Sequence, residues 1–241
     1  MLVAHNSGGE RIYCQNASKD NAYFCPECGG VLVVKQGRVK VWHFAHKSYS
    51  GCSMEGETTH HLELKDSLYH MFKGMSWVQQ CELEYPIAAI NRRADIWIAT
   101  DQARIAIECQ VSPISVQELQ TKLYAYTQHG IYTTYVLHDK SLPEPDEYDE
   151  AIIPVWIREL HALKNPLYIG SPMDVHGTKL IWSLDLADVV RDNDYIGYSY
   201  TLKTKKKVHY QVNPISNMTY QIIPSQGKYL NGPFRMAYFV G

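Results

Sequence analysis

Residues 92–112 read RRADIWIATDQARIAIECQVS, two apolar segments joined by a short polar turn, and they predict two neighbouring β-strands. Successive side chains of a strand point to opposite faces, so residues two apart share a face. Paired as a hairpin, the two strands would bring Asp95, Glu108 and Gln110 to one side of a sheet. The same alternation groups Asp95 with Trp97.

Two carboxylates and a carboxamide that converge on one side form a candidate metal site. Carboxylate oxygens suit a hard divalent cation such as Mg²⁺, which keeps several waters and takes only one or two protein carboxylates. Such a cation can generate hydroxide and hold a phosphodiester during in-line attack. The pattern therefore predicts a nuclease that depends on Mg²⁺ or Mn²⁺ at Asp95 and Glu108.

The composition excludes several other classes of protein. Hydrophobic residues make up 45% of the 241 residues and charged residues 20%, as in ordinary soluble globular proteins. The formal net charge of −2 excludes a globally basic nucleic-acid coat, so local basic patches would have to hold a DNA partner. No apolar run approaches the roughly 18 residues of a membrane span. The first residues lack the regions of a signal peptide, and we expect a cytoplasmic protein.

A second motif, near the start of the chain, has the spacing of a zinc site. Cys25-x2-Cys28 is followed by a predicted hairpin that returns the chain to His43-x2-His46. Four such ligands suit tetrahedral Zn²⁺, and an ion with all four positions filled would serve to fold the segment. Cys52 is a fifth candidate that could displace His46. The alternatives are a redox cysteine pair and a site that has lost its metal.

The segment between this motif and the acidic strands is predicted to be a helix capped by Thr58 or Thr59. Glu57, His61 and Lys65 are each four residues apart, so they form one stripe along it. Such a trio can be a solvated row of salt bridges. Its position just before the acidic strands equally favours a part in catalysis.

The order of predicted elements divides the chain into parts. A zinc-finger-like module at 1–55 precedes an α/β core at 56–140, in which a helix, three strands, a helix and a strand follow one another. A proline-broken acidic stretch then leads into an extension at 141–241, first α/β and then β-rich. Within it, Lys203–Lys207 reads as the tip of a hairpin, either a solvated turn or a finger that touches backbone phosphates.

Several motifs in this order resemble the competence protein CoiA family. HLELK at 61–65, RADI at 93–96 and IECQVS at 107–112 look like its nuclease core, and the cysteine and histidine motif looks like its zinc-ribbon-like N-terminal part. The resemblance covers about residues 10–165. It implies a restriction-endonuclease-like core of the PD-(D/E)XK superfamily, with the order αβββαβ. It also implies a deoxyribonuclease that processes incoming DNA for recombination during bacterial competence, with DNA and recombination proteins as partners.

Carried over residue by residue, the resemblance implies that Asp95 and Glu108 bind the catalytic cation. Gln110 stands where the superfamily has a lysine, which can orient water and offset charge on the phosphate, whereas a carboxamide can only form hydrogen bonds. Lys65 could supply the missing positive charge. Glu57 could complete the metal shell, and His61 lies beside it.

Two further residues are weaker candidates. Glu84, on the first predicted strand of the core, is either another acidic site residue or a solvated carboxylate at the end of a strand. Lys122, in the helix predicted over 115–129, is a possible phosphate contact, whereas Tyr126 belongs to the apolar face of that helix.

Two other functions remain open at this point. One is a DNA-binding accessory protein of recombination on a nuclease fold, weakly active or inactive because of Gln110. The other is a zinc-dependent module that recruits recombination partners through residues 1–55. Loss of metal-dependent cleavage in Asp95→Ala and Glu108→Ala proteins that stay folded would favour the nuclease.

Overall fold

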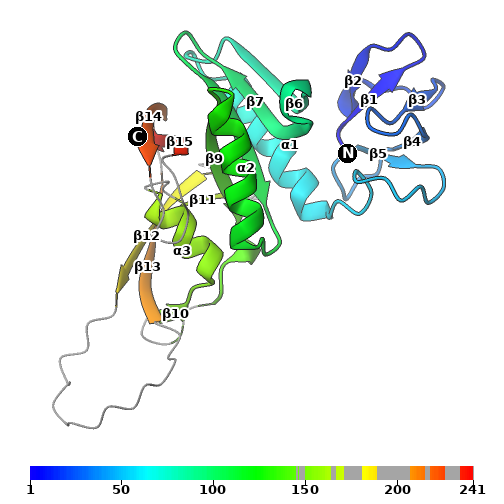
Figure 1. Ribbon diagram of the computed structural model, residues 1–241. Helices are drawn as coiled ribbons and strands as arrows, with labels where there is room; N and C mark the ends of the chain where they lie inside the picture. Colours follow the sequence, from blue (N-terminus) through cyan, green and yellow to red (C-terminus); the bar gives the residue numbers. More distant parts are fainter. Residues whose placement is uncertain are drawn as a thin grey trace, which may run out of the picture.

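The computed structural model describes residues 1–144, 146, 150–163, 167–170, 181–188, 207–214, 218–225 and 234–240. In this part the chain is an α/β protein with two β-sheets (Figure 1). The elements of the N-terminal sheet are β1 (Val3–Asn6), β2 (Arg11–Tyr13), β3 (Tyr23–Phe24), β4 (Val31–Lys35) and β5 (His43–His46). The elements that follow, up to the second sheet's central strands, are α1 (Thr59–Lys73), β6 (Gln80–Ile87), β7 (Arg92–Ala99), β8 (Arg104–Gln110), α2 (Val116–Gln128) and β9 (Tyr132–His138). The remaining elements are β10 (Glu150–Ile152), α3 (Val155–Ala162), β11 (Leu167–Gly170), β12 (Ile181–Asp188), β13 (Lys207–Pro214), β14 (Thr219–Ser225) and β15 (Phe234–Val240).

The N-terminal sheet has the strand order β2-β1-β3-β4-β5. Its strands are short, and a turn between β3 and β4 carries the first cysteine pair. Gly29 has φ +69° in this turn, a left-handed conformation that glycine adopts without strain. Its N–H donates to the carbonyl of Cys25 at 2.9 Å. The small sheet therefore holds the tight turn that the cysteine motif predicts.

The second sheet contains the predicted α/β core. The elements α1, β6, β7, β8, α2 and β9 follow in the predicted order, and β6, β7 and β8 pair antiparallel. β9 lies parallel to β8. Among the described residues, the sheet continues from β9 through β11, β12 and β13 to β10, while β15 also pairs with β9. The β-rich extension and the core thus share one sheet.

The two long helices cover opposite faces of this sheet (Figure 1). The apolar stripe of α1, including Leu64 and Leu68, is buried against Ile105 and Ile107 of β8. Ala106, between these isoleucines, packs in a different cluster together with Tyr126 of α2. Strand alternation therefore separates an α1 side from an α2 side of the sheet.

The ladder between β6 and β7 is interrupted at one position. The ladder pairs Leu83 with Ile96 and Tyr85 with Ala94. The pair expected between these two, Glu84 with Asp95, is missing. Glu84 has φ +49°, in the left-handed region that non-glycine residues rarely adopt. Backbone strain of this kind tends to gather at functional sites.

The prediction that Asp95 shares a face with Trp97 is wrong. Asp95 contacts His61 and Lys65 of α1, whereas Trp97 packs in the cluster with Tyr126 of α2. The reason is the interrupted ladder, because strict alternation holds only along an unbroken strand.

The N-terminal module is joined to the core through hydrogen bonds between main-chain groups and side chains. The N–H groups of Leu2 and Val3 donate to the Glu84 carboxylate at 2.8 and 3.1 Å. The guanidinium of Arg11 donates to the carbonyl of Leu83 at 2.7 Å. The first strand of the small sheet therefore fixes the strained position of β6.

Two further sequence predictions concern a membrane span and the lysine-rich hairpin tip. None of the helices in its described part has the length and apolar character that crossing a membrane requires. Apart from Lys207, where β13 begins, the predicted lysine tip lies outside the described residues.

Candidate active site and metal centre

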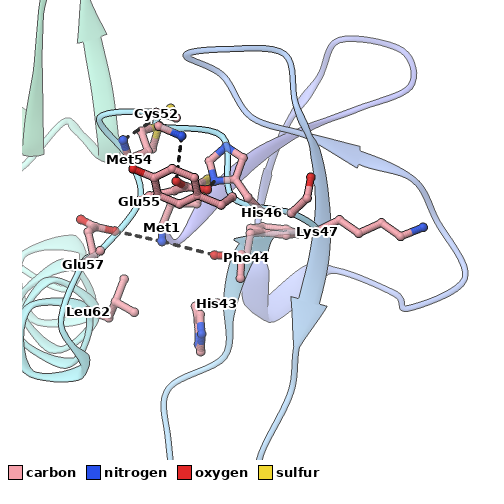
Figure 2. Close-up of a pocket in the computed structure, with 15 residues that line it drawn as sticks. Met1, His43, Phe44, His46, Lys47, Cys52, Met54, Glu55, Glu57 and Leu62 are labelled. Atoms are coloured by element: carbon pink, nitrogen blue, oxygen red, sulfur yellow. Dashed lines mark hydrogen bonds and ion pairs between the residues drawn. The ribbon is translucent and has the colours of Figure 1, made fainter.

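Three cysteines and a histidine gather beside the N-terminal sheet, and Figure 2 shows two of the four, His46 and Cys52. The ligand atoms of Cys25, Cys28, His46 and Cys52 all lie within 4.8 Å of one another. The Cys28 Sγ is 3.3 Å from the His46 Nε2, and the Cys25 Sγ is 3.8 Å from the Cys52 Sγ. A set of thiols and an imidazole at this spacing can hold a metal ion. It is a candidate metal centre.

His43, one of the zinc ligands expected from the sequence, lies outside this cluster. His43 and His46 occupy the two ends of β5, three residues apart, so their side chains leave opposite faces of the strand. The His43 Nδ1 lies 2.9 Å from the carbonyl oxygen of Val41 instead. Cys52 takes the place of His43, whereas the sequence suggested that it could displace His46.

Polar contacts surround the four candidate ligands. The His46 Nδ1 is 3.4 Å from the Glu55 carboxylate, the contact that commonly orients a metal-binding imidazole. The Gly30 N–H and His46 lower the pKa of the Cys28 thiol to about 7, toward the thiolate that binds metals. Burial raises the pKa of Cys25 to about 11.

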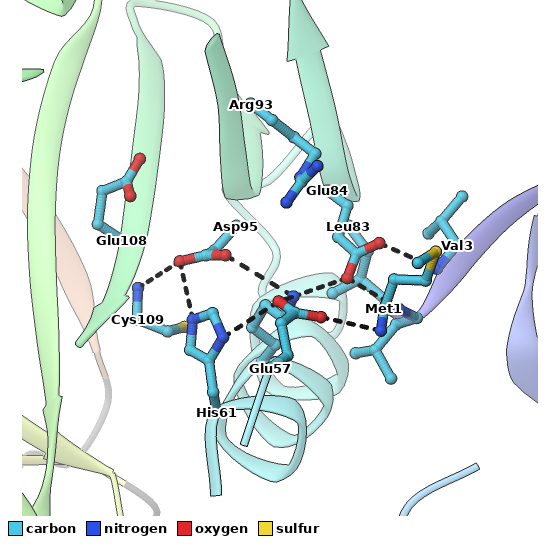
Figure 3. Close-up of polar contacts among 12 residues, drawn as sticks. Met1, Val3, Glu57, His61, Leu83, Glu84, Arg93, Asp95, Glu108 and Cys109 are labelled. Carbon is cyan, nitrogen blue, oxygen red and sulfur yellow. Dashed lines mark hydrogen bonds and ion pairs between the residues drawn. The ribbon is translucent and has the colours of Figure 1, made fainter. Parts of the chain in front are cut away.

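A second cluster lies between α1 and β7 (Figure 3). Ligand atoms of Glu57, His61 and Asp95 also lie within 4.8 Å of one another. The His61 ring bridges the two carboxylates, with Nδ1 3.1 Å from Glu57 Oε1 and Nε2 3.3 Å from Asp95 Oδ2. The N–H of Cys109 donates to Asp95 Oδ2 at 2.9 Å. The strand β8 therefore helps to orient Asp95.

The start of α1 positions two of these three groups. Thr58 is the N-cap, and its hydroxyl accepts the N–H of His61 at 3.2 Å. This confirms one of the two predicted caps. The cap fixes Glu57 just before the helix and His61 in its first turn, so their side chains meet.

Charge attraction outweighs burial in this cluster. Burial opposes the charge on His61, but Asp95 and Glu57 raise its pKa to about 9. Burial also opposes the charge on Asp95, but His61 and Lys65 hold the pKa of Asp95 well below its usual range. At neutral pH an imidazolium therefore lies between two carboxylates.

Lys65 lies behind the carboxylates with a fully buried side chain. Its Nζ is 2.6 Å from the Glu84 carboxylate and 3.8 Å from Asp95 Oδ1, and it also pairs with Glu57. Burial opposes its charge, but Glu84 and Glu57 raise the pKa of Lys65 above its ordinary value. The predicted row of Glu57, His61 and Lys65 does come together. It is not a solvated row of salt bridges.

Glu108 projects to the α2 side of the sheet. Its Oε2 is 3.0 Å from the Lys122 Nζ, and its Oε1 accepts a hydrogen bond from the Tyr126 hydroxyl. Attraction to Glu108 raises the pKa of Lys122 despite partial burial. The side chain of Gln110 donates to the carbonyl of Ser112.

A cavity of about 320 Å³ links the two acidic groups. Asp95 and Glu108 both line it, together with Gln110, Arg93 and Lys122. The structure thus brings the predicted carboxylates to one cavity, but Asp95 contacts α1 and Glu108 contacts α2, so the prediction that they lie on one side of the sheet is wrong. Whether they hold one cation together stays a prediction.

The sequence analysis treated Lys122 only as a possible phosphate contact and assigned Tyr126 to the apolar face of its helix, not to the site. The two residues are four apart on α2, so they lie one above the other on the same helical face. That spacing, in the helix directly after the strand of Glu108, is the signal that could have found them. The sequence analysis also left open that Glu84 is a solvated carboxylate. In the structure Glu84 is buried, with 1% of the residue exposed.

Comparison with known proteins agrees with this arrangement. Residues 9–55 match the family model of the competence protein CoiA N-terminal domain, and residues 57–152 match that of the CoiA nuclease-like domain. The chain belongs to the competence protein CoiA family. It is 35% identical over 123 residues to the Competence protein CoiA of Bacillus subtilis (strain 168), an alignment that covers 49% of this chain. The aligned part is 32% of the length of that relative.

Proposed function

We propose that this CoiA family member is a deoxyribonuclease that depends on a divalent cation and processes DNA during competence. The observation that carries the proposal is the cluster of Glu57, His61 and Asp95 at the wall of a cavity that also contains Glu108 and Lys122. The nuclease-like domain of the family spans this cluster. The proposal includes a PD-(D/E)XK core and cytoplasmic action.

The donor set suits a divalent cation. Two carboxylates and an imidazole offer ligand atoms within 4.8 Å, and their charges can balance a cation once the imidazolium loses its proton. The imidazole makes a transition-metal ion such as Mn²⁺ a better match than Mg²⁺, which prefers oxygen ligands. Such an ion would polarise the phosphodiester and lower the pKa of a bound water.

The protein's own groups would do the remaining work. In the hydrolysis, a water oxygen bonds to phosphorus, the bond from phosphorus to one ester oxygen breaks, and the water proton passes to that leaving oxygen. Lys65 holds Glu57 and Glu84 in place from behind, at a position where it cannot touch the substrate. Gln110 can orient water by hydrogen bonds once its side chain leaves Ser112.

A cleavage assay on several DNA forms with Mn²⁺ tests the proposal. We expect the wild-type protein to cleave DNA and the Asp95→Asn protein, which keeps the side-chain shape, to lose at least about 100-fold in rate. Because Asp95→Asn removes a charge partner of His61 and Lys65 and should lower stability, the assay is run at a temperature at which circular dichroism shows both proteins fully folded, so that a loss of rate is chemical. Cleavage by the Asp95→Asn protein at the wild-type rate would contradict the proposal.

One observation favours the second candidate, a DNA-binding accessory protein with weak turnover. Each described carboxylate of the cavity already has a protein cation beside it, His61 at Asp95 and Lys122 at Glu108. A metal ion bound by His61 would have to displace at least the proton that makes this imidazole a cation. DNA binding without cleavage, at any Mn²⁺ concentration, would favour this candidate.

We also propose that the cysteine cluster binds Zn²⁺ for structure. Three thiols and one imidazole form a complete tetrahedral set, which leaves no position open for catalysis. Cys52 is five residues from Glu57 in the sequence, so the ion would fix the segment that leads into the second cluster. This module could also contact recombination proteins.

A further inference from the structure

Besides the proposed metal ion, a positively charged side chain that reaches the phosphate would favour hydrolysis in this cavity. Negative charge grows on the phosphoryl oxygens during hydrolysis, and a fixed positive group beside them lowers the barrier. The cationic side chains among the cavity-lining residues are Arg93, His61 and Lys122. His61 is engaged by two carboxylates, and Arg93 lies 3.9 Å from Glu27 of the N-terminal module.

Lys65 cannot take this part. Its side chain is 0% exposed, and it is not among the residues that line the cavity. Its ammonium is surrounded by the carboxylates of Glu57, Glu84 and Asp95. Moving it toward a phosphate would leave these buried carboxylates without their partner, which is costly.

Lys122 has the position and the freedom that Lys65 lacks. It lines the cavity, and 24% of its side chain is exposed, against 3% for the Glu108 side chain that holds it. Its described polar contact is the one to Glu108 Oε2 at 3.0 Å. An ammonium has more N–H donors than this contact uses. It can therefore bind a phosphoryl oxygen without leaving Glu108.

Glu108 is itself held in place. The hydroxyl of Tyr126, fully buried one helical turn beyond Lys122, donates to the other carboxylate oxygen, Oε1. With one oxygen bound by Tyr126 and the other by Lys122, the carboxylate has a defined orientation. The rigid helix α2 thus supplies both the cation and the group that orients its anchor.

We propose that Lys122 is the catalytic cation that contacts the phosphate, and that Glu108 and Tyr126 are its positioning residues. The inference rests on the proposed nuclease function and adds to it a residue on α2. Glu108 would then act mainly through Lys122.

The test compares four proteins with the wild type in Mn²⁺-dependent cleavage of a labelled DNA oligonucleotide. They are Lys122→Met, Lys122→Arg, the double variant Lys122→Met with Gln110→Lys, and the control Lys73→Met. Gln110 lies two residues after Glu108 on the same strand and lines the same cavity, so a lysine there can return a cation to it. Lys73 is an exposed lysine of α1 outside the cavity.

We expect Lys122→Met to lower kcat by about 100-fold with KM changed less than about 3-fold, because the contact strengthens in the transition state. Lys122→Arg, which keeps the charge, should lose much less. The double variant should be at least about 10-fold faster than Lys122→Met. If Lys122 were merely structural, a lysine on β8 would not restore the activity. Lys73→Met should match the wild type.

Two results would overturn the inference. If Lys122→Met keeps a kcat within about twofold of an active wild type, the contact plays no part in the reaction. If its activity is lost but neither the arginine nor the Gln110→Lys change restores any, Lys122 is structural. A wild-type protein without cleavage would overturn the nuclease proposal and this inference together, so the two failures are distinguishable.

Discussion

Lys65 and Glu84 form an ion pair of 2.6 Å in which the two side chains are 0% and 1% exposed. Glu84 also accepts the N–H groups of Leu2 and Val3, so the pair joins α1 to the N-terminal strand. Breaking a buried pair by removing one partner leaves an uncompensated charge. This contact therefore links the stability of the core to the attachment of the N-terminal module.

A first prediction concerns this pair. Glu84→Gln and Lys65→Met should each lower the free energy of unfolding by about 3–5 kcal/mol, because each removes a direct ion-pair partner of a buried charge. The double variant should lose less than the sum of the two. Urea denaturation of the four proteins completes the cycle.

A non-polar control separates packing from charge in this experiment. Leu68→Ala removes a fully buried side chain of the same helix and should be additive with Glu84→Gln. If the losses in free energy of unfolding of Lys65→Met and Glu84→Gln also add up in their double variant, the ion pair does not couple the two elements.

Local signals made most of the fold predictable. The N-cap at Thr58 depends on neighbours within a few residues, and it is one of the two positions that the sequence predicted. The order of helices and strands in the core is also as predicted. The spacing of Cys25 and Cys28 predicted the cysteine turn for the same reason.

The parts that sequence reasoning missed depend on partners far away in the chain. The interrupted ladder at Glu84 is set by contacts with Leu2, Val3 and Lys65, which no local pattern encodes. The choice of Cys52 over His43 depends on which face of β5 meets the cysteine turn. Alternation is a good guide only where the ladder is unbroken.

A second prediction concerns the metal centre. Purified protein should contain a stoichiometric amount of zinc, and Cys52→Ser should lose most of it because a thiolate ligand is removed. His43→Ala should keep the zinc, since the His43 ring contacts a carbonyl oxygen outside the cluster. Elemental analysis measures both. Loss of zinc in His43→Ala with retention in Cys52→Ser would restore the ligand set expected from the sequence.

A third prediction concerns pH in buffer without added divalent cations. The pKa of His61 is raised from 6.5 to about 9, so its charge stabilises the folded state fully below pH 6.5. This contribution, at most about 3 kcal/mol, is lost as the pH rises toward 9. His61→Gln should flatten this part of the pH dependence of urea unfolding. Wild-type and variant curves that fall in parallel would show that His61 is not charged in the folded protein.

A fourth prediction separates the two roles open to Glu108. If Glu57, His61 and Asp95 hold the cation, Glu108→Gln should leave Mn²⁺ affinity within about 3-fold, whereas Asp95→Asn should weaken it by at least about 10-fold. Glu108→Gln should still slow cleavage, because a neutral amide anchors Lys122 less firmly than the carboxylate at 3.0 Å does. Calorimetric titration of Mn²⁺ measures both affinities. Equal weakening in the two variants would make Glu108 a direct ligand, as the sequence first indicated.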